Sequence, residues 1–151
     1  MRLLVDSNII VDCFMCRKPF CESARKLLLL GYLGEVELFT SSSQVTDVFY
    51  IISRGGKKRY IKQARNAIKA VRGAVGIVQV GEAEVDAALD SSWQDFEDAC
   101  VYQAARSIRA DVIITRNQTD FEESSIKVFS CEEFFDWLED EEGVVYEEVD
   151  F

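Results

Sequence analysis

Acidic and amide side chains stand where the sequence predicts the end of a strand or the body of the next helix. Asp6 ends the apolar segment RLLVD, Asp47 lies in the helix after the next strand, and Asp98 opens a later helix in DFEDA. Asn117 and Asp120 follow the strand DVIIT. Because the chain contains no His, imidazole catalysis and His-ligated zinc are excluded. The remaining chemistry uses carboxylates, hydroxyls, thiols, amines or a metal ion held by oxygen ligands.

Each of these residues also has an ordinary structural explanation. Asp6 would cap the helix that follows it, and Asp95 would cap the helix that contains DFEDA. Glu97, in the first turn of that helix, would complement the helix dipole. Asp47 alone would be a solvated helix residue, and the two residues after DVIIT are of types common in turns. Only the ordered set as a whole favours a shared site.

Short β-branched segments alternate with helix-like segments along the chain. This alternation is typical of a parallel sheet covered on both faces. The sequence therefore predicts one three-layer α/β/α sandwich with a short parallel sheet over residues 1–138, followed by an acidic tail at 139–151. Ligands of such sheets bind at the carboxyl ends of the strands. The predicted strands cover residues 2–6, 36–39, 76–80, 111–115 and 127–129, and the predicted helices cover 7–16, 23–33, 44–54, 57–72, 82–89, 95–108 and 132–138.

Charge is distributed unevenly in this chain of net charge −10. The segment 131–151 holds ten of the 27 acidic residues and no base. Between Asp47 and Glu82 there is no acid, and eight bases occupy that stretch. We expect this segment to bind RNA phosphates without base specificity, although a solvated helix face is the alternative. The predicted RNA contacts are Arg54, Lys57, Lys58, Arg59, Lys62 and Arg65.

The acidic tail contains several apolar residues and is expected to pack on something. We hypothesise that it lies against a basic surface, on its own chain or a neighbour, and partly imitates RNA. Deletion of residues 140–151 would then tighten RNA binding at low salt.

The five cysteines are odd in number, so a complete disulfide framework is excluded. Cys13 and Cys16 form a CxxC motif with Cys21 nearby, but no second motif and no His accompany them. Reduced thiols in the cytoplasm are the expectation. No apolar run approaches the length of a membrane span, and no signal peptide is recognised, so no membrane partner is expected.

Three segments of the chain resemble the motifs of the PIN-domain ribonuclease family, in the expected order. VDSNIIVD is similar to the first motif, and SSSQVTDVFYIISR to the second, in which an acid follows a Ser-rich helix cap. DFEDACVYQAARSIRADVIITRNQTDF resembles the third and fourth motifs joined, and is the most specific stretch. The resemblance spans about residues 1–138. It implies a PIN-like fold, ribonuclease activity, and the toxin of a toxin–antitoxin pair, with an antitoxin partner and a homodimer.

The resemblance also implies roles for individual residues. Several carboxylates close together require a cation, and Mg²⁺ or Mn²⁺ takes oxygen ligands and activates water. The implied catalytic residues are Asp6, Asp47, Asp98 and Asp120. The implied metal ligands are Asp6, Asp98, Asp47 and Asn117. Hydroxyl and amide groups suited to positioning the water or phosphate belong to Ser7, Asn8 and Thr115.

Two departures from the family pattern leave an alternative open. Asp47 stands where the family usually has Glu and is one methylene shorter, and Asn117 stands where many members have Asp. Both favour a catalytically weak or inactive PIN-like module that binds RNA or a protein. An α/β phosphatase or receiver-like domain with Asp6 as phosphate acceptor is a third possibility. It lacks the second Asp two residues on, and the Lys after a late strand.

Overall fold

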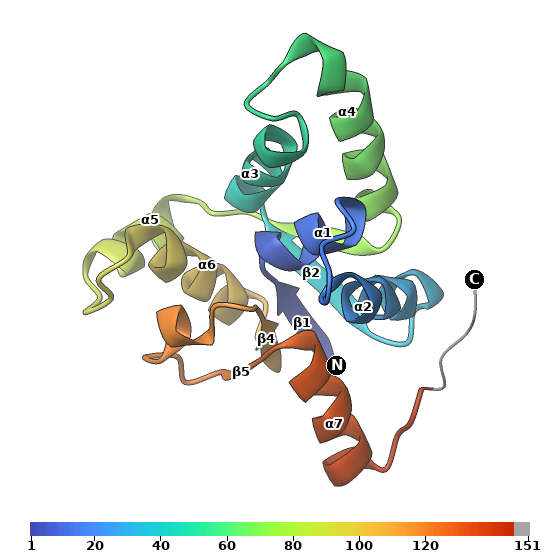
Figure 1. The fold of residues 1–151 in the computed structure, drawn as a ribbon. Helices are drawn as coiled ribbons and strands as arrows, with labels where there is room; N and C mark the ends of the chain where they lie inside the picture. Colours follow the sequence, from blue (N-terminus) through green and yellow to red (C-terminus); the bar gives the residue numbers. More distant parts are fainter. Residues whose placement is uncertain (147–151) are drawn as a thin grey trace.

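The computed structural model describes residues 1–146 and is built on a five-stranded parallel sheet (Figure 1). The strands lie in the order β3-β2-β1-β4-β5, and every pairing between neighbours is parallel. The chain runs outward from β1 to β3 and then returns to the other side of β1. The strand order therefore reverses between β1 and β4, where α/β sheets bind their ligands. The strand bounds are β1 Arg2–Val5, β2 Glu37–Ser41, β3 Val75–Val78, β4 Val112–Ile114 and β5 Lys127–Phe129.

Helices cover both faces of this sheet, because successive side chains of a strand point to opposite faces. Leu3 and Val5 of β1 join one core with Leu27, whereas Leu4 joins a second core with Val101. The first core collects residues of α1, α2, α3, α4 and α7, and the second collects residues of α6 and the short helix η1. The helix bounds are α1 Ser7–Phe14, α2 Cys21–Leu33, α3 Ser42–Ile52, α4 Lys58–Arg72, α5 Glu82–Leu89, α6 Phe96–Ser107, η1 Gln118–Phe121 and α7 Cys131–Glu142.

The helices α3 and α4 form a hairpin that extends away from the sheet (Figure 1). Gly55 and Gly56, between them, have φ of 80° and 81°, a region that glycine enters without strain. Ala64, Ala67 and Val71 form the buried stripe of α4. The basic residues of the hairpin are exposed, so they are available to a polyanion.

The fold class predicted from the alternation of segments is confirmed, and the differences lie in element bounds. The first predicted helix extended to residue 16, but α1 ends at Phe14. β1 ends at Val5 because Asp6 caps α1, and α3 begins at Ser42 because Ser41 is its cap. The third helix therefore starts before the predicted residue 44.

The predicted end of the second helix at residue 33 is confirmed, and Gly31 lies inside the helix near that end. α2 continues through Gly31 and ends at Leu33, with Gly34 as a left-handed cap at φ 77°. A Cβ on Gly31 would lie 2.4 Å from Leu38 Cδ1 and 2.9 Å from the backbone oxygen of Ala74. The glycine is required because α2 approaches β2 and β3 closely.

The last helix is longer than the predicted 132–138. Ser130 caps α7 in a capping box with Glu133, and the helix continues to Glu142, where Gly143 ends it at φ 64°. Ser23 Oγ of α2 donates a 2.6 Å hydrogen bond to Glu132, which ties α7 to the first core layer. The first residues assigned to the acidic tail are therefore helical, and residues 147–151 of that tail lie outside the described residues.

Two further expectations concern the cysteines and the membrane. All five cysteines are free thiols, and Cys100 is buried on α6. Within residues 1–146, no helix combines the length and the apolar character needed to span a bilayer.

Candidate active site

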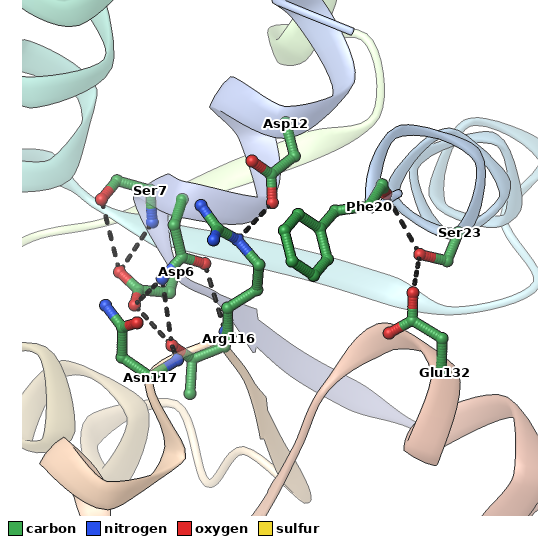
Figure 2. Close-up of polar contacts among 10 residues, drawn as sticks. Asp6, Ser7, Asp12, Phe20, Ser23, Arg116, Asn117 and Glu132 are labelled. Carbon is green, nitrogen blue, oxygen red and sulfur yellow. Dashed lines mark hydrogen bonds and ion pairs between the residues drawn. The ribbon is translucent and has the colours of Figure 1, made fainter. Parts of the chain in front are cut away.

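Asp6 lies at the centre of the candidate site, directly after β1 and at the start of α1 (Figure 2). Its Oδ1 accepts hydrogen bonds from the backbone N of Ser7 at 2.7 Å and from Gln44 Nε2 at 2.6 Å. Its Oδ2 accepts from Thr115 Oγ1 at 2.7 Å and from Asn8 Nδ2 at 3.0 Å. Donors from α1, α3 and the end of β4 therefore fix the orientation of this carboxylate.

Gln44 reaches Asp6 because the cap of α3 holds its amide. Gln44 Oε1 accepts a 3.1 Å hydrogen bond from the backbone N of Ser41, which completes the capping box. With Oε1 held in this way, Nε2 points to Asp6. Gln44 is 1% exposed, so its amide needs both partners. The contact of Gln44 with Asp6 could not be predicted, because the S-x-x-Q pattern signals a cap but not a contact with the end of β1.

The start of α6 brings a second group of carboxylates to the site. Asp95 caps the helix by accepting a hydrogen bond from the backbone N of Asp98 at 3.0 Å. Burial raises the pKa of Asp98 to about 7, assisted by the negative charges of Asp95, Asp120, Asp6 and Glu97. The negative charges of Asp6, which follows β1, and of Asp120 in η1 thus act on Asp98. Residues from separate parts of the chain therefore meet at this edge of the sheet.

Asp47 of α3 joins this group through Glu97. A hydrogen bond with Asp47 is the main reason that the pKa of Glu97 rises to about 7, with burial and the charges of Asp47, Asp95 and Asp6 adding to it. The sequence analysis assigned Glu97 only to the helix dipole. The structure places it beside the second predicted catalytic residue, and only the tertiary contact between α3 and α6 could reveal this.

The remaining predicted residues lie in the loop after β4 and in the first turn of α1. Thr115 is fully buried and Asn117 is exposed. The backbone N of Asn117 donates to Thr115 Oγ1 at 3.0 Å, and Asn8 Nδ2 donates to the same oxygen at 3.2 Å. Ser7 Oγ lies 3.4 Å from Asp6 Oδ1. Ser7, Asn8 and Thr115 all therefore contact Asp6 directly.

A buried ion pair borders the site, which the sequence analysis did not anticipate. Asp12 of α1 is 0% exposed, and its Oδ2 lies 2.6 Å from Arg116 Nε (Figure 2). Burial raises the pKa of Asp12, against the opposing effect of the Arg116 charge. The guanidinium also lies over the Phe20 ring, 4.4 Å from its centroid.

All six predicted RNA-binding residues are exposed on the α3–α4 hairpin and its connecting loop. Arg54 lies over the Tyr60 ring, 4.4 Å from its centroid. A hollow of about 580 Å³ between α1, α3 and α4 is lined by Phe14, Ile52, Arg59, Lys62, Gln63, Asn66 and Ala67. Two of the predicted contacts thus border a concave surface of mixed apolar and basic character.

The side chains of the site fit a hard divalent cation in their chemistry. Their donor atoms are oxygens, which Mg²⁺ and Mn²⁺ prefer. The pKa of Glu97 is raised mainly by the hydrogen bond with Asp47, and that of Asp98 mainly by burial, and nearby negative charges add to both shifts. A cation would offset the repulsion among these charges. Within residues 1–146, no three acidic or thiol groups are arranged to hold an ion as they stand. The carboxylates would therefore have to come closer together on binding.

Comparison with known proteins places this geometry in a family. The sequence model of the PIN domain matches residues 2–119. Ribonuclease VapC1 of Aquifex aeolicus (strain VF5) is 30% identical in an alignment of 138 positions that covers 88% of this chain and 92% of that protein.

Solved structures share the fold at lower identity. VapBC2 from Rickettsia felis, bound to a DNA fragment from its promoter, gives a TM-score of 0.63 at 14% identity and covers 86% of this chain and 98% of that chain. A toxin–antitoxin complex from Klebsiella pneumoniae gives 0.59 at 22% identity, with 85% and 97% covered. With a family model and a relative that both span most of its length, the chain belongs to the PIN domain family.

Proposed function

We propose that this protein is a metal-dependent endoribonuclease that hydrolyses RNA phosphodiester bonds and acts as the toxin of a toxin–antitoxin pair. The observation that carries the proposal is the gathering of carboxylates around Asp98, at the point where the strand order reverses. Burial raises the pKa of Asp98 to about 7, and the negative charges of these neighbouring carboxylates add to the rise. The similarity to Ribonuclease VapC1 supports the same reaction.

The proposed ligands of Mg²⁺ or Mn²⁺ are Asp6, Asp98, Asp47 and Asn117, with Asp120 as a further catalytic carboxylate. When bound, such an ion supplies positive charge that activates water and offsets the charge that develops on the phosphate. Asp6 enters this site preoriented, because Gln44 and Thr115 donate to its two oxygens. Asp47 is one methylene shorter than the Glu that the family usually has at this position. Glu97 lies beside Asp47 and supplies a longer carboxylate at the same place in the site.

The remaining proposed roles concern binding and assembly. The exposed bases of the α3–α4 hairpin bind the RNA backbone through its phosphates. The solved toxin–antitoxin complexes of the same fold support an antitoxin as partner. We also infer a homodimer that acts in the cytoplasm, with residues 1–138 as its PIN domain and residues 139–151 as an acidic tail.

The test compares RNA cleavage by the wild type with cleavage by Asp6→Asn and Asp98→Asn. Each variant removes one proposed ligand charge and keeps the side-chain shape, so cleavage is expected to fall at least a hundredfold while RNA binding remains. Asp86→Asn is the matched control, because Asp86 is exposed on α5. Wild-type rates in both site variants would contradict the proposal.

A second candidate function is an RNA- or protein-binding PIN module without useful catalysis. Two observations favour it: no three acidic groups among the described residues are arranged to hold an ion, and Asp47 raises the pKa of the neighbouring Glu97. RNA binding by the wild type, without cleavage at any Mn²⁺ concentration, would support this second function instead.

A further inference from the structure

One face of α1 holds the loop after β4 at two points. Asn8 and Asp12 are four residues apart in this helix and therefore project from the same face. Asn8 Oδ1 accepts a hydrogen bond from the backbone N of Arg116 at 3.4 Å. Asp12 Oδ2 lies 2.6 Å from Nε of the same arginine (Figure 2). The backbone and the side chain of Arg116 are thus both anchored to α1.

Arg116 lies between two residues of the candidate site. Thr115 Oγ1 donates to Asp6 Oδ2 at 2.7 Å and accepts from the backbone N of Asn117 at 3.0 Å. A shift of the Arg116 backbone would displace both neighbours, because the three residues are consecutive. Arg116, which pairs with Asp12, is therefore separated from Asp6 only by Thr115.

The ion pair is poorly suited to a purely stabilising role. Asp12 is 0% exposed, and in the part of the chain that the structure describes neither of its oxygens makes an aligned hydrogen bond. Burial of two charges carries a large desolvation cost, and apolar residues of similar volume are often at least as stable. Apolar side chains at both positions would also contact the Phe20 ring, but they would not hold position 116 to α1 through a directional contact. The charges of Asp12 and Arg116 therefore fix the position of the loop at residues 115–117.

We propose that Asp12 is a positioning residue for the candidate site, which acts through Arg116 to hold residues 115–117 against Asp6. The inference rests on the proposed function, because the loop that it concerns carries a proposed metal ligand, Asn117. A neutral side chain at position 12 would release the guanidinium, which is 27% exposed and can turn toward solvent. Thr115 and Asn117 would then lose their fixed place, and metal binding would weaken while RNA binding would not.

The experiment measures Mn²⁺ affinity by titration calorimetry, unfolding temperature in EDTA, and hydrogen exchange of the backbone amides of residues 115–117. The variants are Asp12→Asn, Arg116→Lys and the apolar pair Asp12→Leu with Arg116→Met. Glu37→Gln is the matched control, because it breaks an exposed ion pair with Arg2 whose atoms lie 3.5 Å apart. RNA binding in EDTA is measured for every protein.

Asp12→Asn is expected to weaken Mn²⁺ binding about tenfold or more, as loss of outer-shell partners does, and to speed exchange at Asn117. The apolar pair is expected to keep the wild-type unfolding temperature and to lose Mn²⁺ affinity to the same extent. Arg116→Lys keeps the buried carboxylate paired, so it folds and is expected to show an intermediate loss. The control and all RNA affinities are expected to match the wild type.

Wild-type Mn²⁺ affinity in the apolar pair or in Arg116→Lys would overturn the proposal, and would assign the ion pair to packing alone. The Mn²⁺ affinities of the apolar pair and of Arg116→Lys test the proposal even if Asp12→Asn does not fold. A wild-type protein that neither binds Mn²⁺ nor cleaves RNA would instead contradict the proposed function. In that case unchanged exchange at Asn117 in the apolar pair would still overturn the role of Asp12 in holding the loop.

Discussion

Gln44 Nε2 donates a 2.6 Å hydrogen bond to Asp6 Oδ1 and thereby joins the start of α3 to the end of β1. The same amide closes the cap of α3 through Ser41. One buried side chain thus sets both where the third helix begins and how the central carboxylate of the candidate site is oriented.

Replacement of Gln44 by Met, which keeps its length, is expected to destabilise the protein by about 1–3 kcal/mol, because the Ser41 N–H and an Asp6 oxygen lose a buried partner. The measurement is urea unfolding in EDTA. Gln63→Met on the exposed face of α4 is the control. A change within about 0.5 kcal/mol, typical of surface substitutions, would mean that the amide is not required.

The stability of the metal-free protein is expected to depend on pH through Glu97 and Asp98. Both have a pKa of about 7 in the folded state, against about 4 in an unfolded chain. Between these values the folded state binds more protons than the unfolded state, so stability falls as pH rises from about 4 to about 7. Thermal unfolding in EDTA measures this. The double variant Glu97→Gln with Asp98→Asn should show a weaker fall over that range, and an unchanged fall would refute the assignment.

Gly31→Ala is expected to destabilise the fold by about 1–3 kcal/mol, as overpacking of a core does. The added Cβ would lie 2.4 Å from Leu38 Cδ1 and 2.9 Å from the Ala74 backbone oxygen, so α2 would have to move from the sheet. Gly73→Ala, whose nearest contact would be 3.3 Å, serves as the milder comparison in the same unfolding assay. Equal effects of the two substitutions would show that the close approach of α2 is not what matters.

The sequence allowed the strand ends to be predicted because β-branched segments and helix caps are local signals. Asp6, Thr115 and Asn117 were found in this way, since Asp6 and Thr115 directly follow strands and Asn117 lies two residues after Thr115. Glu97 and Gln44 were not, because each resembles an ordinary residue of a first helical turn. Their roles depend on contacts between α3, α6 and β1 that no local pattern encodes.

The same limit applies to the ion pair of Asp12 with Arg116. An acid within an apolar helix and a base after a strand give no sign that they will meet, and the pairing depends on how α1 packs beside the β4 loop. The close packing at Gly31 could not be predicted for a related reason. Glycine favours helix ends, but here the space beside Leu38 decides its position.

The basic hairpin is expected to set RNA affinity and not the rate of the chemical step. Lys58→Gln with Lys62→Gln should weaken binding and reduce the slope of log affinity against log salt by about 0.7 for each lost contact with single-stranded RNA. The rate at saturating RNA should stay unchanged. Lys18→Gln, an exposed base outside the hairpin, is the control. An unchanged salt slope would remove the hairpin from the RNA interface.

Cleavage of end-labelled RNA by the wild-type protein, with added Mn²⁺ or with EDTA, tests the central claim most directly. Burial and the neighbouring carboxylates raise the pKa of Asp98 to about 7, and the proposed role of this group of carboxylates is to hold an ion. Cleavage with Mn²⁺ that stops in EDTA and returns when Mn²⁺ is restored is the predicted result. Cleavage at the same rate in EDTA would contradict the account.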